Sequence, residues 1–181
     1  MGKNILYIDC GMGAAGDMLT AALLELFDDP DAIVDELNAL GLPGIEYRRE
    51  ESVKCGITGT HMTVLANGME ESPEMFGHDH GHDGDSGHSA AHDSAAFDLK
   101  AAFAQIPSRV RKDVKAVYRL IAEAESHVHG MPIGQVHFHE VGSMDAIADV
   151  TAVCLLMRKL SPDEVIVSPV NTGTGKVKCA H

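Results

Sequence analysis

The sequence predicts an α+β fold in which amphipathic helices cover a small mixed or antiparallel β-sheet. Three observations predict it. A short apolar run precedes a stretch of helical periodicity, two β-type stretches flank a glycine, and helical periodicity returns in the second half. Strands and helices in separate blocks favour segregated layers. With 181 residues, 45% hydrophobic and 23% charged, the chain can bury a core, and we expect a single domain, 1–181.

The first predicted elements are a buried strand and a helical region. Residues 4–8 form a short apolar run bounded by Asp9 and a glycine cluster, as in a buried strand. Apolar residues then recur at helical spacing over 19–27 and again over 33–40, on either side of Pro30. The pattern indicates either two amphipathic helices or one helix broken at Pro30.

The next predicted elements are two antiparallel strands, over about 45–54 and 59–66, with Gly56 between them. In the second half, apolar residues step by three or four over 110–128, which predicts a helix.

Pro107 and Ser108 are start signals for that helix. A further helical pattern runs over 147–157 and stops near Ser161, and residues 165–170 suit a final strand.

A change of composition marks an insertion at about 67–96. Residues 66–96 contain seven acidic residues and five histidines, but no lysine or arginine. A segment so polar and rich in glycine and serine cannot bury enough apolar surface to fold, so we expect a disordered, Asp/His-rich insertion. It carries seven of the 13 excess negative charges.

The histidines of this insertion predict a metal-binding segment. Imidazole and carboxylate groups together suit a divalent late transition metal, and the absence of thiolate argues against Cu(I). Because ordering each residue costs roughly 1 to 2 kcal/mol, we expect exchangeable capture rather than a tight structural site. The alternative is a solvated linker with no metal function. The five candidate ligands are His78, His80, His82, His88 and His92.

A second histidine motif precedes the predicted helix over 147–157. His137 and His139 alternate, so in an extended segment they would share a face, with Glu140 and Asp145 nearby. Such a group could hold a metal ion or transfer protons. The alternative is that both histidines make structural hydrogen bonds where the helix begins.

A glycine-rich turn joins the first strand to the first helix. Gly11, Gly13 and Gly16 fit the pattern G-x-G-x-x-G, in which glycines let a nucleotide phosphate approach the helix amino terminus. However, Asp9 and Asp17 would repel an unscreened phosphate, so an anion would need a bridging cation. The helical pattern over 33–40 also replaces the second strand of a dinucleotide fold. The alternative is a plain turn with Asp17 capping the helix.

Composition excludes several functional classes. The formal net charge of −13 makes a nucleic-acid partner improbable, and no apolar stretch is long enough to span a membrane. Without a recognisable signal peptide, we expect a cytoplasmic protein. The four cysteines form no CxxC pair, so neither a zinc knuckle nor a disulfide scaffold is expected.

Taken together, the motifs resemble the amino-terminal region of the LarC family, the nickel insertion proteins of nickel-pincer cofactor biosynthesis. The resemblance spans essentially the whole chain in the same order. It rests on the opening Tyr7-Ile8-Asp9-Cys10 with Gly13 and Gly16-Asp17-Met18, the His-rich insertion, the block His137–Gly142 with Asp145, and the closing Gly173–Gly175 and Val177–His181. One departure is Gly11-Met12-Gly13-Ala14-Ala15-Gly16, where the family commonly has a Phe-Ser-Gly-Ile-Ser-Gly type of loop. This makes the dinucleotide pattern incidental.

The resemblance implies a nickel chelatase or cyclometallase, classed as a lyase. It would insert nickel into pyridinium-3,5-bisthiocarboxylic acid mononucleotide while CTP, with a divalent cation, is hydrolysed to CMP and diphosphate. The insertion histidines would collect nickel. The implied core-site candidates are Asp9, Asp17, His137, His139, Glu140 and Asp145, with Gly13 and Gly16 as candidates for cofactor binding.

The resemblance also implies partners. A carboxyl-terminal LarC domain is expected to carry the CTP site, and a lactate racemase-type apo-enzyme to receive the product. This chain would then be an incomplete enzyme, and self-association stays open. The alternatives are a non-catalytic nickel store or metallochaperone and a nucleotide-binding enzyme that uses the glycine-rich turn.

Overall fold

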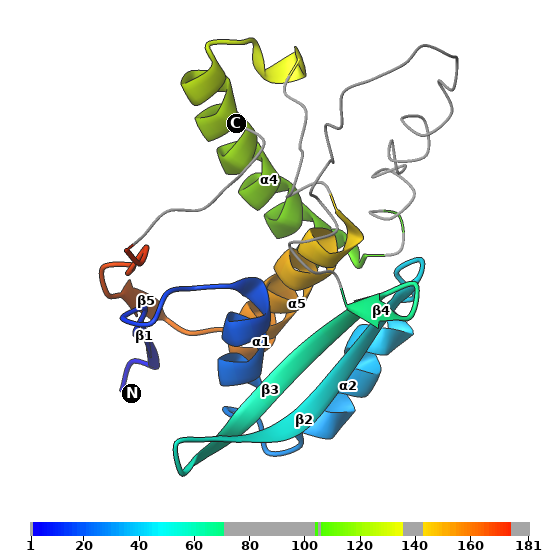
Figure 1. Ribbon diagram of the computed structural model, residues 1–181, viewed down its shortest axis with the longest axis vertical. Helices are drawn as coiled ribbons and strands as arrows, with labels where there is room; N and C mark the ends of the chain where they lie inside the picture. The colour runs from blue at the N-terminus through cyan, green and yellow to red at the C-terminus, as the bar shows by residue number, and fades with distance from the viewer. Residues whose placement is uncertain (1, 71–103, 105, 136–142, 175–181) are drawn as a thin grey trace, which may run out of the picture.

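The computed structural model describes residues 2–70, 104, 106–135 and 143–174 (Figure 1). The chain contains both helices and strands, which agrees with the predicted mixture of α and β structure. One helix ends at Leu24 and the next begins at Pro30, so the first helical region is two helices rather than one continuous helix. The elements are β1 (Ile5–Ile8), α1 (Gly16–Leu24), α2 (Pro30–Ala39), β2 (Ile45–Lys54), β3 (Ile57–Ala66), β4 (Met69–Glu70), α4 (Ser108–His129), the 3-10 helix η2 (Ile133–Gln135), α5 (Met144–Leu160) and β5 (Glu164–Val167).

The described strands form two sheets, so the prediction of one small sheet was wrong. β1 pairs with β5 in parallel, with Leu6 opposite Val165, whereas β2, β3 and β4 form an antiparallel sheet. Hydrophobic periodicity identifies strands but not their partners. The pairing of the first strand with the last is set by how the intervening helices pack.

The β2–β3 hairpin confirms the predicted pair of antiparallel strands. Lys54 pairs with Ile57 across a two-residue turn. Both turn residues, Cys55 and Gly56, have positive φ angles, of 53° and 78°. Such turns match the right-handed twist of the two strands. β4 lies within the insertion predicted at 67–96, so that boundary was placed too early, and residues 71–96 lie outside the described ranges.

The two long helices begin and end at recognisable signals. α4 starts directly after Pro107, as predicted, and ends at Gly130, whose φ of 62° stops the helix. α5 begins after Ser143, whose hydroxyl accepts a hydrogen bond from the Ala146 N–H at 3.2 Å. This cap fixes the first turn of α5, which carries Asp145. None of the described helices is long and apolar enough to cross a membrane.

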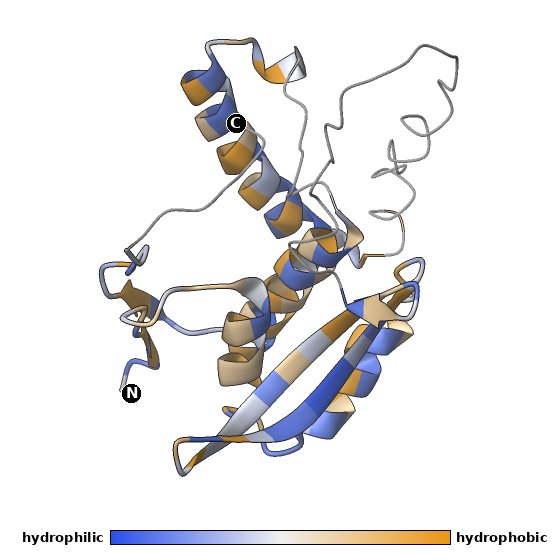
Figure 2. Cartoon of the chain, viewed as in Figure 1, coloured by the Kyte–Doolittle hydropathy of each residue, from blue (hydrophilic) through white to orange (hydrophobic). Residues whose placement is uncertain are grey.

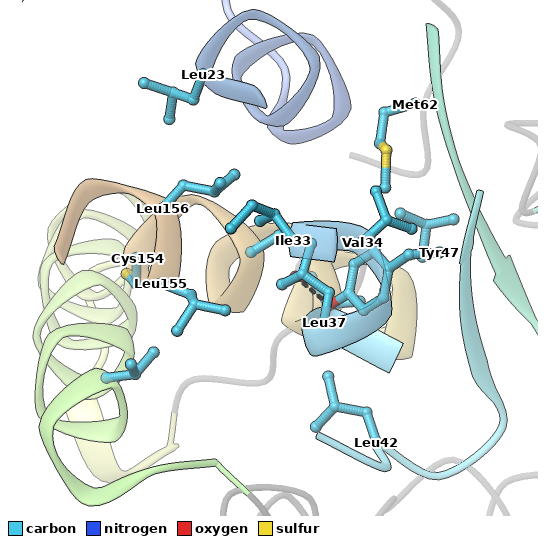
Figure 3. Close-up of a cluster of buried hydrophobic side chains, with 14 of the residues drawn as sticks. Leu23, Ile33, Val34, Leu37, Leu42, Tyr47, Met62, Cys154, Leu155 and Leu156 are labelled. Atoms are coloured by element: carbon cyan, nitrogen blue, oxygen red, sulfur yellow. Dashed lines mark hydrogen bonds between the residues drawn. The ribbon is translucent and has the colours of Figure 1, made fainter. Parts of the chain in front are cut away.

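The hydrophobic core surrounds α5. This helix contacts α1, α4 and the β2–β3 hairpin, and α2 packs against β2 (Figure 1). Leu24, Leu37, Ile147 and Leu156 are completely buried, and Figure 3 shows side chains from these helices meeting beside the hairpin. The apolar stripes predicted from sequence therefore face one shared core.

Tyr47 on β2 ties the hairpin to two helices. Its side chain is 2% exposed, and its hydroxyl donates to the Ala148 carbonyl of α5 at 2.8 Å. Its backbone N–H donates to Asn38 Oδ1 of α2 at 2.8 Å, and Asn38 Nδ2 donates back to the Tyr47 carbonyl at 3.0 Å. Burial raises the pKa of the phenol, and the nearby charges of Asp149 and Asp145 add to this. The phenol therefore stays a hydrogen-bond donor.

We expect Tyr47→Phe to lower the free energy of unfolding by about 1 kcal/mol, because a buried hydrogen bond is lost without a large cavity. Urea denaturation measures this loss. Tyr7→Phe is the matched control, because Tyr7 is 61% exposed and should lose almost nothing. Equal effects of the two substitutions would contradict the assigned role of the Tyr47 hydroxyl.

Candidate functional site

Three carboxylates gather where the amino terminus of α1 meets α5. Asp149 of α5 accepts a hydrogen bond from the backbone N–H of Asp17, and it feels the negative charges of Asp145 and Asp17. We call Asp17, Asp145 and Asp149 the acid cluster. It joins two segments that lie more than 100 residues apart in the sequence.

Gly16 makes this contact sterically possible. A Cβ atom at position 16 would lie 2.5 Å from both Cγ and Oδ2 of Asp149, which is closer than side chains approach. Ala15, the residue before the helix, has no side-chain cap to offer the first turn of α1. The Asp149 carboxylate therefore supplies an acceptor, and its negative charge suits the positive end of the helix dipole.

Asp17 lies inside the first turn of α1 and is not its cap. The helix begins at Gly16, and the Asp17 side chain accepts from the N–H of the next residue, Met18, at 2.7 Å. The interpretation of Asp17 as the capping residue was therefore wrong, because the helix begins two residues earlier than that interpretation requires.

The environment of Asp149 opposes ionisation. Burial, with the charges of Asp145 and Asp17, raises the pKa of Asp149 to about 7, although the Asp17 N–H acts in the opposite direction. Its Oδ1 atom is buried and has no hydrogen-bond partner in the described part of the chain. Tyr118 of α4 lies close enough to Asp149 to feel its charge. Burial raises the pKa of the Tyr118 phenol, and the charge of Asp149 raises it further. A cation or proton would relieve this unfavourable charge.

Asp9 belongs to a different part of the molecule. Its carboxylate accepts from the Gly11 N–H at 2.9 Å and from the Ser168 hydroxyl at 3.4 Å. Asn171 completes the contact, because its side-chain amide donates to the Gly11 carbonyl at 3.0 Å. The glycine-rich turn after β1 is thus held by the segment that follows β5. The carboxyl ends of parallel strands are a common place for ligands.

Of the predicted site residues, Asp17 and Asp145 each lie close enough to Asp149 for their charges to raise its pKa, and Asp9 lies in the turn. Gly13, with a φ of 95°, lies in that turn, and Gly16 has the packing role described above. Among the described ranges, no three His, Cys, Asp or Glu side chains are arranged to hold one metal ion. The remaining candidates, namely His78, His80, His82, His88, His92, His137, His139 and Glu140, lie outside the described residues.

Asp149 was not identified from the sequence, although a signal was present. Asp145 and Asp149 are four residues apart, so they share one face of α5. Two like charges at this spacing destabilise a helix, so such a pair is a sequence signal for a functional site. Its significance depends on α1, however, because Asp17 and Gly16 give the two acids their neighbours.

An open groove of about 370 Å³ lies between α1 and the β2–β3 hairpin, and Asp17 is the member of the acid cluster that lines it. Asp17 lies on the helix side, and Lys54 and His61 come from the hairpin. The volume is in the range of small-molecule sites. The groove is lined by Asp17, Met18, Ala21, Ser52, Lys54, Ile57, Gly59, Thr60, His61 and Met62.

The chain is similar to proteins named for nickel insertion. It is 34% identical over 178 residues to the pyridinium-3,5-bisthiocarboxylic acid mononucleotide nickel insertion protein of Geobacillus kaustophilus, and the match covers 98% of this chain and 41% of that protein. The proteins of that name from Alkaliphilus metalliredigens and Staphylococcus saprophyticus are 35% and 36% identical, with 99% and 98% of this chain and 42% and 41% of theirs covered. No solved structure matches the chain.

The fold and the acid cluster define a mixed α and β protein with an acidic site between two helices. The sequence profile of the nickel insertion proteins matches residues 6–181, so the chain belongs to that family. The predicted resemblance is confirmed. The chain spans about two fifths of the length of these curated relatives.

We expect Gly16→Ala to destabilise the protein by about 1 to 3 kcal/mol, because the added methyl group overlaps with Asp149. Helix propensity alone favours alanine, so a loss of stability is diagnostic. Thermal and urea denaturation measure it. Gly134→Ala is the control, since a Cβ atom there meets nothing within 4 Å. A neutral or stabilising Gly16→Ala would contradict the close packing of α1 on α5.

We expect the stability of the protein to fall as the pH rises from about 4 to 7, because Asp149 binds its proton more tightly when folded than when unfolded. Asp149→Asn removes this titration. The variant should therefore gain about 1 to 2 kcal/mol over the natural protein between pH 5 and pH 8, after allowance for solvent screening. Denaturation at several pH values measures the difference, with exposed Asp35→Asn as control. Parallel pH profiles for Asp149→Asn and the natural protein would refute this expectation.

Proposed function

We propose that this chain takes part in inserting nickel into pyridinium-3,5-bisthiocarboxylic acid mononucleotide, as the amino-terminal part of a nickel insertion protein. The observation that carries the proposal is the acid cluster, which lies at the start of α5 in a chain of this family. The substrate is the one for which the related proteins are named.

The acid cluster supports a role in holding Ni(II) before transfer. Asp17 and Asp145 provide two carboxylates, and Glu140 precedes Asp145 by only five residues in the sequence. We propose that His137, His139 and Glu140 complete the ligand set, because the described side chains alone do not supply three ligands. Imidazole and carboxylate groups suit Ni(II), and neither binds it as strongly as the sulfur and carbon donors of the product.

Asp149 is proposed as a positioning residue. It accepts from the Asp17 N–H and so fixes where α1 presents the Asp17 side chain. The turn between Asp9 and Gly16 has a related function, because its hydrogen bonds to Ser168 and Asn171 set the path of the chain into α1. In this proposal, Gly13 and Gly16 shape the loop beside the substrate rather than cradle a nucleotide phosphate.

The groove beside Asp17 is the proposed seat of the substrate. A mononucleotide needs a cation for its phosphate, and Lys54 lies on the groove wall opposite α1. Asp17 on the other wall would place a nickel ligand close to the bound ring. Nickel could then pass from oxygen and nitrogen ligands to thiocarboxylate without leaving the groove.

The remaining steps of nickel insertion are proposed to depend on residues outside the described ranges. His78, His80, His82, His88 and His92 are proposed to collect Ni(II) and raise its local concentration. CTP, with its divalent cation, is proposed to bind the polypeptide that corresponds to the carboxyl-terminal part of the relatives. The metallated product would be delivered to a lactate racemase-type apo-enzyme. This assignment makes the chain one component of a cyclometallase.

We expect Asp17→Asn and Asp145→Asn each to weaken Ni(II) binding by at least about tenfold, because each removes a charged ligand. The experiment is calorimetric titration of the chain with Ni(II), and Asp35→Asn on the exposed side of α2 is the control. Because the insertion histidines would bind nickel independently, the same titration is repeated with residues 77–93 deleted. Unchanged affinity of the acid variants in that deleted background would refute the acid cluster as a nickel site.

The deletion also distinguishes an enzyme component from a nickel store. Nickel insertion is followed by the absorbance of the product, with CTP and a separately produced carboxyl-terminal polypeptide of a relative. An enzyme component should keep its turnover when nickel is abundant and lose it only at limiting nickel. A store would lose its nickel stoichiometry and add nothing to turnover at any nickel concentration.

A further inference from the structure

The parallel pair β1–β5 exposes an apolar face to solvent. Because neighbours in a parallel sheet share a face, Tyr7 and Ile166 lie on the same side as Ile5. Their exposed fractions are 61%, 43% and 50%, respectively. Figure 2 shows the pair in the hydrophobic colour at the periphery of the fold, away from the β2–β3 hairpin. We call Ile5, Tyr7 and Ile166 the outer face.

This exposure is unusual for a parallel sheet. Parallel strands are almost always covered on both faces, and their sequences are correspondingly apolar throughout. β1 reads Ile-Leu-Tyr-Ile and β5 reads Glu-Val-Ile-Val, which are sequences of this kind. A sheet of two strands is also marginal when nothing covers it. The residue types therefore suit a more extensive sheet than the two strands described.

The uncovered surface continues around β5. On the opposite face, Leu6 of β1 packs against the hydrophobic core. Its neighbour Val165 is 43% exposed, and Val167 is 52% exposed. β5 thus extends past the core on both faces, whereas β1 is covered on one. Among the described strands, the edge of β5 that faces away from β1 has no partner, so a further strand could be added there.

The length of the relatives indicates what covers this surface. The chain matches 41% of the Geobacillus kaustophilus protein and 42% of the Alkaliphilus metalliredigens protein, so more than half of each has no counterpart here. We propose that the polypeptide corresponding to this remainder docks on β1–β5. It would cover the outer face with apolar side chains and add a strand at the edge of β5.

The docking would also connect the partner to the candidate site. The β1–β5 strands lead at their carboxyl ends into the turn of Asp9 and the segment of Ser168, which contact each other. α1 follows that turn directly and carries Asp17. A partner on the sheet therefore lies next to the loop that positions the acid cluster. The inference rests on the proposed function, because both assign a role to the part of the relatives that this chain does not match.

The test measures binding rather than nickel insertion, so either proposal can fail alone. This chain is titrated with the separately produced carboxyl-terminal part of the Geobacillus kaustophilus relative, and the affinity is measured by calorimetry. We expect Tyr7→Thr and Ile166→Thr each to weaken binding at least about tenfold, since each removes an anchor from the interface. Threonine keeps the strand propensity of both positions. Val53→Thr is the control, because Val53 is equally apolar and 61% exposed but lies on the hairpin.

Amide hydrogen exchange of the unmodified chain tests the same surface without any substitution. The partner should slow exchange in residues 5–8 and 164–167 more than in the β2–β3 hairpin. Binding that is unaffected by both outer-face substitutions, or protection confined to the hairpin, would overturn the proposal. A concentration-dependent dimer of this chain that is lost in both variants would also overturn it, because the occupant would then be a second copy.

Discussion

The contact between Gly16 and Asp149 is the constraint on which the candidate site depends. α1 begins without a side-chain cap, and Asp149 reaches its first turn only because position 16 has no Cβ atom. The carboxylate gains a backbone hydrogen bond but lies close to Asp17 and Asp145, so its pKa rises. The same packing therefore stabilises the helix end and concentrates negative charge. A cation would offset this charge, which is why the acid cluster is proposed as part of a nickel site.

The site and the core share α5. The Ala148 carbonyl accepts a hydrogen bond from the hydroxyl of buried Tyr47. The next residue, Asp149, contacts the first turn of α1. Two ion pairs hold the other end of the helix, from Arg158 to Asp113 of α4 and from Lys159 to Glu36 of α2. Exposed pairs of this kind contribute little each, so the orientation of α5 rests mainly on its buried residues. A change in the core would consequently move the acid cluster.

The two sheets have different relations to that core. The β2–β3 hairpin is covered by α1, α2 and α5, and with α1 it forms the groove proposed for the substrate. The β1–β5 pair positions the glycine-rich turn but leaves apolar side chains exposed. The β2–β3 hairpin is thus packed against helices, whereas the β1–β5 pair keeps an exposed apolar face, which is the surface proposed for docking.

Periodicity by itself determined most of the helices and strands, because an amphipathic stripe or a β-branched run reports directly on one buried face. It located α4, α5 and the β2–β3 hairpin, and the residue motifs were enough to indicate the nickel insertion family. Periodicity could not predict which strands pair. β1 and β5 are separated by over 150 residues, and only the packing of the helices between them brings them together. The role of Gly16 was equally hidden. Its spacing suggested a phosphate loop, but the space that a glycine leaves can be filled from anywhere in the chain, and the tertiary structure fills it with Asp149.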